Sequence, residues 1–112
     1  APKIRAVAGL YGGCYGRARW LEPDADIPVL WLVGGKDTES PPHSCDLSVH
    51  ALESKGLISF YEYPNATHCW DCRSLNGFSK RAGNGRMTTY RYNDTVTKDS
   101  EIRVLEFLKS FE

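Results

Sequence analysis

The sequence predicts an α/β fold in which a parallel sheet of about three strands is flanked by helices. Three apolar runs rich in β-branched residues, at 4–10, 27–33 and 57–63, are each closed by Gly, Pro or Asn, as is typical of strands. Helical spacing of apolar residues occurs at 44–55 and 99–111. Strands that alternate with helices form parallel sheets through right-handed crossovers. The 112 residues are enough for one domain with its own core.

The three apolar runs differ in how their side chains alternate. The run at 27–33 is apolar throughout, which is expected of a strand covered on both faces. The run at 57–63 alternates more, which favours a place nearer the edge of the sheet. The connection after the first run, 11–26, is so rich in Gly and Pro that we expect at most a short helix around 16–21.

Two helices are expected, and each has an apolar side. The first covers 44–55 with Ser44 as its N-cap, and a Gly follows as its stop. Its apolar face consists of Cys45, Val49 and Leu52. The second covers 99–111, with Asp99 or Thr97 as its cap. Its apolar stripe consists of Ile102, Leu105, Leu108 and Phe111, widened by Val104 and Phe107.

The segment 72–97 is polar and Gly-rich, and we expect a long loop with a short strand or hairpin arm at 87–92. Four of its cations are Arg73, Lys80, Arg81 and Arg86. Their simplest interpretation is a solvated loop. The alternative is that they receive a substrate that bears a carboxylate, because they follow a candidate catalytic histidine.

Composition excludes several classes of protein. Fourteen basic residues balance fourteen acidic ones, so the formal net charge is zero, which argues against a nucleic-acid-binding protein. The longest apolar run is far shorter than a membrane span, so we expect no membrane partner. With four cysteines, free thiols in a reducing compartment and disulfides in an oxidising one both stay open, and the sequence leaves the location open between cytoplasm and periplasm or secretion.

Asp37 and His68 are the candidate catalytic residues. Asp37 follows the second apolar run and His68 follows the third. Because reactive groups gather beyond the carboxyl ends of parallel strands, we expect the two side chains to meet at one rim. A carboxylate there can fix the imidazole tautomer, and the other ring nitrogen can act as a general base. Taken singly, Asp37 could be only a turn or helix cap, and His68 only a solvated loop residue.

Four segments resemble dienelactone hydrolase-like enzymes of the α/β-hydrolase superfamily. Residues 29–42 (VLWLVGGKDTESPP) resemble the strand and acid segment of those enzymes, and 60–68 (FYEYPNATH) resemble their histidine segment. Residues 6–14 (AVAGLYGGC) resemble the strand after their nucleophile helix, and 102–111 fit their last helix. Acid before histidine is also the chain order of α/β-hydrolase triads.

This resemblance implies that 1–112 form a single partial domain, the C-terminal part of an α/β-hydrolase fold. The implied activity is ester or lactone hydrolysis of a small molecule, without a cofactor, through a nucleophile, His68 and Asp37. The N-terminal strands and the nucleophile elbow would come from a missing segment or another chain, so we expect the chain alone to be inactive. An uncovered sheet edge beside the first strand would favour oligomers.

Cys14 has a superficial nucleophile motif. It lies after a strand in the pattern G-x-C-x-G formed with Gly12 and Gly16. A nucleophile elbow must lead directly into a helix, and Pro23 leaves little room for one. We therefore keep Cys14 as a minor alternative to a nucleophile from elsewhere.

The pair Cys69 and Cys72 supports a hypothesis from another class. A C-x-x-C pair can be a redox dithiol with a lowered thiolate pKa, although here it follows the third strand and leads into a weak helix. One His and three thiolates can hold zinc, and His43 and Cys45 would complete such a set. A structural role, including a disulfide to Cys45 or Cys14, is the simplest interpretation.

The other histidines and the tryptophans have less specific interpretations. His50 is expected to face solvent, and His43 to lie in a loop or at a site rim. Trp20, Trp31 and Trp70 are expected in the core or in a pocket wall. Trp70 is close enough to His68 in sequence to shape a substrate pocket.

Overall fold

The computed structural model describes residues 4–14 and 26–112. The described strands of the main sheet are β1 (Val7–Leu10), β2 (Val29–Gly34) and β3 (Ile58–Tyr63). All neighbours in this sheet are parallel and the order is β1-β2-β3. The predicted strands and their parallel arrangement are confirmed, with β3 at an edge. The expected helix around 16–21 and Trp20 lie outside the described residues.

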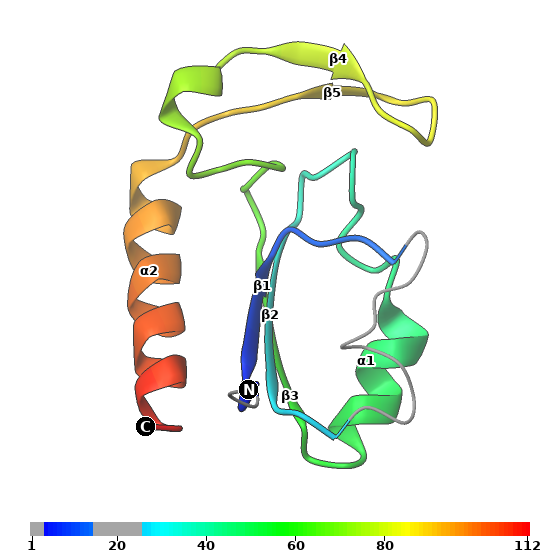
Figure 1. Ribbon diagram of the computed structural model, residues 1–112. Helices are drawn as coiled ribbons and strands as arrows, with labels where there is room; N and C mark the ends of the chain where they lie inside the picture. The colour runs from blue at the N-terminus through cyan, green and yellow to red at the C-terminus, as the bar shows by residue number, and fades with distance from the viewer. Residues whose placement is uncertain (1–3, 15–25) are drawn as a thin grey trace.

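The sheet is covered on both faces by helices, and β2 lies at the centre. Figure 1 shows helix α1 (Asp46–Glu53) on one face and helix α2 (Asp94–Lys109) on the other. All six residues of β2 are buried, as the apolar run predicted. Neither described helix has both the length and the apolarity needed to cross a bilayer.

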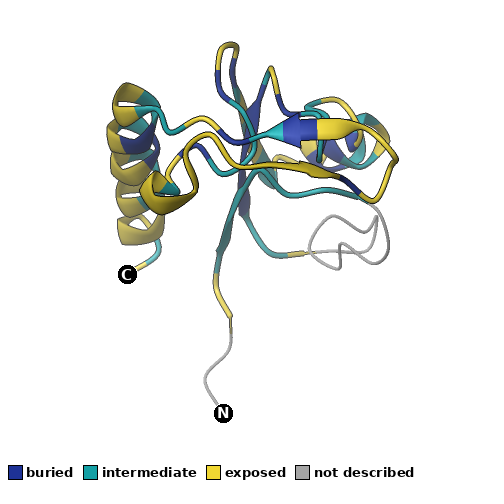
Figure 2. Ribbon diagram, turned by 90° about the horizontal axis from the view of Figure 1, so that it is seen from above, coloured by how far each residue is buried: buried dark blue, intermediate teal, exposed yellow. Residues whose placement is uncertain are grey.

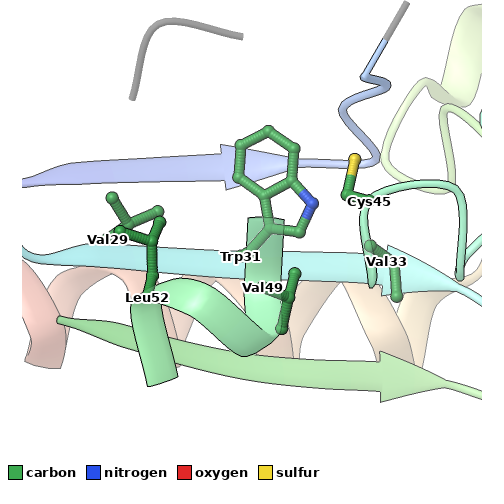
Figure 3. Packing of buried hydrophobic residues seen from close by; sticks show 6 residues of the cluster. All are labelled: Val29, Trp31, Val33, Cys45, Val49 and Leu52. Atoms are coloured by element: carbon green, nitrogen blue, oxygen red, sulfur yellow. The ribbon is translucent and has the colours of Figure 1, made fainter. Parts of the chain in front are cut away.

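Alternate residues of β2 build two separate cores. On the α1 side, Figure 3 shows the cluster of Val29, Trp31, Val33, Cys45, Val49 and Leu52. On the α2 side the cluster consists of Leu30, Leu32, Tyr63, Ala66 and Trp70. This division follows from the strand, in which successive side chains point to opposite faces. Burying a large apolar side chain in either core contributes roughly 1.5–3 kcal/mol.

Helix α1 presents the expected face, but its cap differs from the prediction. Val49 and Leu52 are buried, and Cys45 occupies the N-cap position without a side-chain hydrogen bond. The Ser44 hydroxyl instead donates to the carbonyl of Pro41. Ser44 is drawn into the preceding turn, so the helix begins one residue later than a Ser44 cap would place it.

Helix α2 begins earlier than predicted and packs through another face. Asn93 is its cap, and the Asn93 side chain accepts a hydrogen bond from the backbone N–H of Val96. The predicted caps, Asp99 and Thr97, lie inside the helix. Side chains that pack on the core are Val104 and Phe107, whereas Ile102, Leu105 and Leu108 are exposed. In Figure 2, exposed residues cover most of the helix.

The rotation of α2 follows from buried polar contacts with Trp70. The indole Nε1 of Trp70 donates to Ser100 Oγ at 3.1 Å, and Thr97 donates to the Trp70 carbonyl at 3.2 Å. Thr97 and Ser100 are buried in consequence. Unpaired buried polar groups are costly, so these two bonds favour the observed rotation, together with the packing of Val96, Val104 and Phe107 on the core.

The segment predicted as a long loop contains regular structure. It holds a short 3₁₀ helix, η2 (Arg73–Leu75), and an antiparallel hairpin of β4 (Ser79–Arg81) and β5 (Met87–Thr89). The expected hairpin arm at 87–92 is therefore confirmed, and the expectation of an otherwise irregular loop is wrong. Figure 1 shows the hairpin lying across the end of the main sheet where its strands terminate.

Candidate active site

The loops that follow β2 and β3 lie against each other at the carboxyl end of the sheet. The N–H of Gly35 donates to Tyr63, and the N–H of Lys36 donates to Ala66. A Cβ on Gly34 would lie 2.5 Å from the Ala66 carbonyl oxygen, and one on Gly35 would lie 2.5 Å from that of Pro64. Only glycine permits this approach. It brings the loop that carries His68 onto the loop that carries Asp37.

Asp37 and His68 are in direct contact, as the sequence predicts. His68 Nδ1 lies 2.9 Å from Asp37 Oδ2. The Asp37 side chain is fully buried, and 14% of the His68 side chain is exposed. The other oxygen of Asp37 accepts the backbone N–H groups of Glu39 at 2.8 Å and Ser40 at 2.7 Å. Asp37 is thus both a turn cap and the partner of the imidazole. The two interpretations of Asp37 offered by the sequence are therefore both correct as descriptions of its contacts.

The second nitrogen of His68 faces Glu39, which sequence reasoning did not select. His68 Nε2 lies 3.0 Å from Glu39 Oε2. The other oxygen, Oε1, accepts the Tyr90 hydroxyl at 2.6 Å and pairs with Lys80 Nζ at 3.2 Å. Burial raises the pKa of Glu39, but the hydrogen bond from Tyr90, the facing His68 and the contact with Lys80 outweigh it, and the pKa lies below its usual value. The sequence feature that could have pointed to Glu39 is its place two residues after Asp37, in the same loop.

Two tyrosine rings lie against the imidazole of His68. The centroid of the Tyr11 ring is 4.6 Å from that of His68, and the Tyr90 centroid is 5.7 Å away. The Tyr11 hydroxyl donates to Asp71 at 3.0 Å. Burial and this bond raise the pKa of Tyr11 to about 12, so its phenol is neutral at physiological pH.

Backbone strain is present on both sides of this site. Tyr11 has φ of 43° and Cys69 has φ of 60°, and these are left-handed conformations that bulky residues seldom adopt. Tyr11 contacts the His68 ring and Cys69 follows His68 in the chain. Strained residues cluster at functional sites, where the surrounding structure holds them.

A cavity of about 570 Å³ adjoins the carboxylate of Glu39. It is lined by Gly13, Glu39, Ser40, Gly83 and Asn84. The β4–β5 hairpin is fastened to the loop that bears the acid, because Asn84 Nδ2 donates to the Thr38 carbonyl at 3.0 Å and Thr38 Oγ1 donates to Met87 at 3.1 Å. The hairpin therefore forms one wall of the site.

The four cysteines form two disulfides, Cys14–Cys45 and Cys69–Cys72. The minor alternative of Cys14 as nucleophile is wrong for the disulfide-bonded chain, because the Cys14 sulfur is bonded to Cys45. The zinc set of His43, Cys45, Cys69 and Cys72 is also wrong. Among the described residues, the possible metal ligands that lie close together are Cys69, Asp71 and Cys72, without His43 or Cys45. Both sulfurs of this group are bonded to each other in the disulfide.

Trp70 and the other histidines lie away from the proposed chemistry. Trp70 is fully buried in the core on the α2 side, which is one of its two predicted places, and its ring contacts the ring of Tyr11. His43 is exposed and bonded to Asp46 and Glu62, and His50 is exposed as expected.

Of the four cations Arg73, Lys80, Arg81 and Arg86, Lys80 is the one that contacts the site, through Glu39. Arg73 bonds to Tyr92, and Arg81 donates to the carbonyl of Gly85. Tyr11, Lys80 and Tyr90 carry no sequence motif that links them to His68. Their contacts arise from the hairpin and from the turn after β1.

Comparison with known proteins gives a match in structure. No protein-family model matches the sequence, and no curated protein matches it. The chain is similar to a crystal structure described as a "putative dienelactone hydrolase" from Klebsiella pneumoniae, with a TM-score of 0.63 and 23% sequence identity. The fold is of the α/β-hydrolase type. The alignment covers 91% of this chain and 40% of that chain, so this chain spans less than half of the α/β-hydrolase that it matches.

Proposed function

We propose that this chain supplies the acid and the base of a hydrolase that acts on small esters or lactones. In this proposal Asp37 orients His68, and His68 deprotonates a Ser or Cys nucleophile that attacks the carbonyl. Water activated by the same imidazole then hydrolyses the acyl-enzyme. The observation that carries the proposal is the 2.9 Å contact between His68 Nδ1 and the fully buried Asp37 carboxylate, at the ends of adjacent parallel strands.

The environment of Asp37 supports this division of roles. Two backbone N–H groups bind one of its oxygens, so the carboxylate is fixed and its second oxygen is directed at the imidazole. A carboxylate held in this way stabilises the imidazolium that forms when His68 takes a proton. The similarity to a structure described as a dienelactone hydrolase supports the same class of chemistry.

The nucleophile is proposed to come from a segment outside this chain. Within the described residues, both ring nitrogens of His68 are partnered by carboxylates rather than by a hydroxyl or a thiol. The alignment covers 40% of the matched protein, and the remainder of that protein is long enough to contain such a segment. β1 ends the described sheet, and its outer backbone is the edge where a further strand would pair.

The test is ester hydrolysis by the complete protein that carries this chain, followed with p-nitrophenyl acetate and a simple lactone. His68→Ala should lower kcat/KM by about a thousandfold, since general base catalysis contributes about 10²–10⁴. His43→Ala is the matched control, because His43 also lies between two carboxylates but is on the surface. It should leave the rate unchanged.

Labelling with a fluorophosphonate or with iodoacetamide, followed by mass spectrometry, would identify the nucleophile. The expected label is on a Ser or Cys outside the 112 residues. Ester hydrolysis that survives His68→Ala, or a complete protein without hydrolysis of either substrate, would overturn the proposal. The chain alone should show no turnover.

A thiol-exchange activity is the second candidate. The observation that favours it is the disulfide between Cys69 and Cys72, the oxidised form of a C-x-x-C dithiol. Titration of thiols in buffers of graded glutathione redox potential tests this function. Reversible opening of Cys69–Cys72, with catalysed reduction of a disulfide substrate, would support it, and a pair that stays closed would exclude it.

A further inference from the structure

Glu39 occupies the position that a nucleophile must take if His68 is a general base. A base accepts a proton through a free lone pair, and Asp37 already engages Nδ1. The nitrogen left for catalysis is Nε2, which lies 3.0 Å from Glu39 Oε2. In this arrangement the catalytic nitrogen is not free.

Counting hydrogen-bond donors shows which forms of the ring fit both contacts. An ionised carboxylate only accepts hydrogen bonds, and a neutral imidazole has a single N–H group. Two carboxylates can therefore be bonded at the same time only by a ring that carries a proton on each nitrogen. With both carboxylates ionised, the two contacts of His68 are those that an imidazolium would make, and an imidazolium cannot remove a proton from a nucleophile.

Glu39 is itself held by the hairpin. Its Oε1 accepts the Tyr90 hydroxyl at 2.6 Å and pairs with Lys80 at 3.2 Å. Lys80 lies in β4, and Tyr90 directly follows β5. The hairpin therefore holds the Glu39 carboxylate in position through these two contacts. The cavity of about 570 Å³ beside Glu39 gives the side chain space to turn away from the imidazole.

We propose that Glu39 is a latch: its carboxylate occupies Nε2 of His68 at rest, and His68 becomes available as a base only when Glu39 leaves Nε2. This inference rests on the proposed hydrolase function and adds a positioning residue to it. The charged and titratable groups that face the ring are Asp37, Glu39, Tyr11 and Tyr90, and Lys80 pairs with Glu39. A substrate or nucleophile that takes the place at Nε2 would displace the Glu39 side chain into the adjoining cavity.

The latch can be tested on this 112-residue chain without measuring hydrolysis. With ¹⁵N-labelled histidine, NMR at neutral pH shows which ring nitrogens carry hydrogen. The wild-type chain should give N–H signals from both nitrogens of His68. In Glu39→Gln the carboxamide can donate to Nε2, so the Nε2–H signal should disappear while the Nδ1–H signal, bonded to Asp37, remains.

Glu62→Gln is the matched control, because Glu62 bonds to Nε2 of the surface His43 at 2.9 Å. It should leave both His68 signals unchanged. Tyr90→Phe keeps the Glu39 carboxylate and removes one of its bonds, so exchange of the Nε2 proton with water should accelerate about fivefold, the effect of one hydrogen bond. This variant also serves if Glu39→Gln does not fold.

The inference is overturned if wild-type His68 carries a single ring proton, or if folded Glu39→Gln keeps both. If the Nε2 proton of His68 exchanges equally fast in Tyr90→Phe and in the wild type, the hairpin does not hold Glu39 in place, and that part of the inference is overturned. These outcomes are independent of the proposed hydrolase activity. A doubly protonated His68 in a complete protein that hydrolyses no ester would leave the latch standing and remove the catalytic proposal.

Discussion

His43 and His68 are each held between two carboxylates, but their surroundings differ. His43 lies 3.1 Å from Asp46 and 2.9 Å from Glu62, and His68 lies 2.9 Å from Asp37 and 3.0 Å from Glu39. The side chain of His43 is 62% exposed, whereas that of His68 is 14% exposed.

The comparison shows that the same kind of histidine–carboxylate contact occurs in two very different surroundings. Exposed ion pairs are screened by water and hold their side chains weakly. Asp37 is buried and anchored by two backbone N–H groups, and two tyrosine rings pack against His68. Burial, anchoring and the position at the strand ends distinguish the two sites.

The largest expected effect is a difference in kcat between substitutions of the two aspartates that pair with these histidines, Asp37 and Asp46. In the proposed complete hydrolase, Asp37→Asn should lower kcat by about a thousandfold, because an amide N–H facing Nδ1 selects the wrong imidazole tautomer. Asp46→Asn removes the corresponding partner of His43 and should not change kcat. Steady-state kinetics with circular dichroism as a folding control measures this. Equal effects of the two substitutions would show that the two sites do not differ in function.

A second difference concerns the disulfide near each histidine. Cys14–Cys45 joins residues 31 apart in sequence, and Cys69–Cys72 joins residues 3 apart. Loop-closure entropy gives about 4 kcal/mol for the longer loop and about 2 kcal/mol for the shorter one. Urea unfolding of the two double Cys→Ala variants should show this order in the free energy of unfolding. The reverse order would mean that the Cys69–Cys72 turn stabilises the fold through native contacts around His68.

The smallest effects are expected in the dependence of stability on pH, and they have opposite signs. The pKa of Glu39 is lowered, so its contribution to stability is present above its ordinary value of 4.5 and is lost as pH falls through the folded-state pKa. The hydrogen bond to Asp46, with help from Glu62, raises the pKa of His43. Its contribution is present below 6.5 and is lost as pH rises through the folded-state pKa.

Urea unfolding of the wild type, Glu39→Gln and His43→Gln across pH 3–9 separates these two contributions. The difference between wild type and Glu39→Gln should shrink in acid, and that between wild type and His43→Gln should shrink above neutral pH. The His43 effect should be the weaker because that side chain is exposed. A His43 difference that grows with pH would contradict the assignment.

The parts of the fold that local patterns encode were predictable. The buried run of β2, the alternating β3 and the buried face of α1 follow from strand and helix periods within a few residues. The face of α2 was not predictable, because Trp70 lies 30 residues from Ser100 and their buried hydrogen bond fixes the helix rotation. The pairing of Cys14 with Cys45 likewise depends on how the chain folds back, since several pairings were open in the sequence.

By itself, the sequence determined that Asp37 and His68 follow neighbouring parallel strands, and the geometry of such strands then brings their side chains to one rim. The tertiary structure decided what surrounds that pair. Glu39 reaches Nε2, and Lys80 and Tyr90 reach Glu39, through contacts between residues 29 to 51 positions apart. Such contacts depend on where the hairpin lies over the sheet. No periodicity records that position, because it results from the sum of many weak interactions between distant segments.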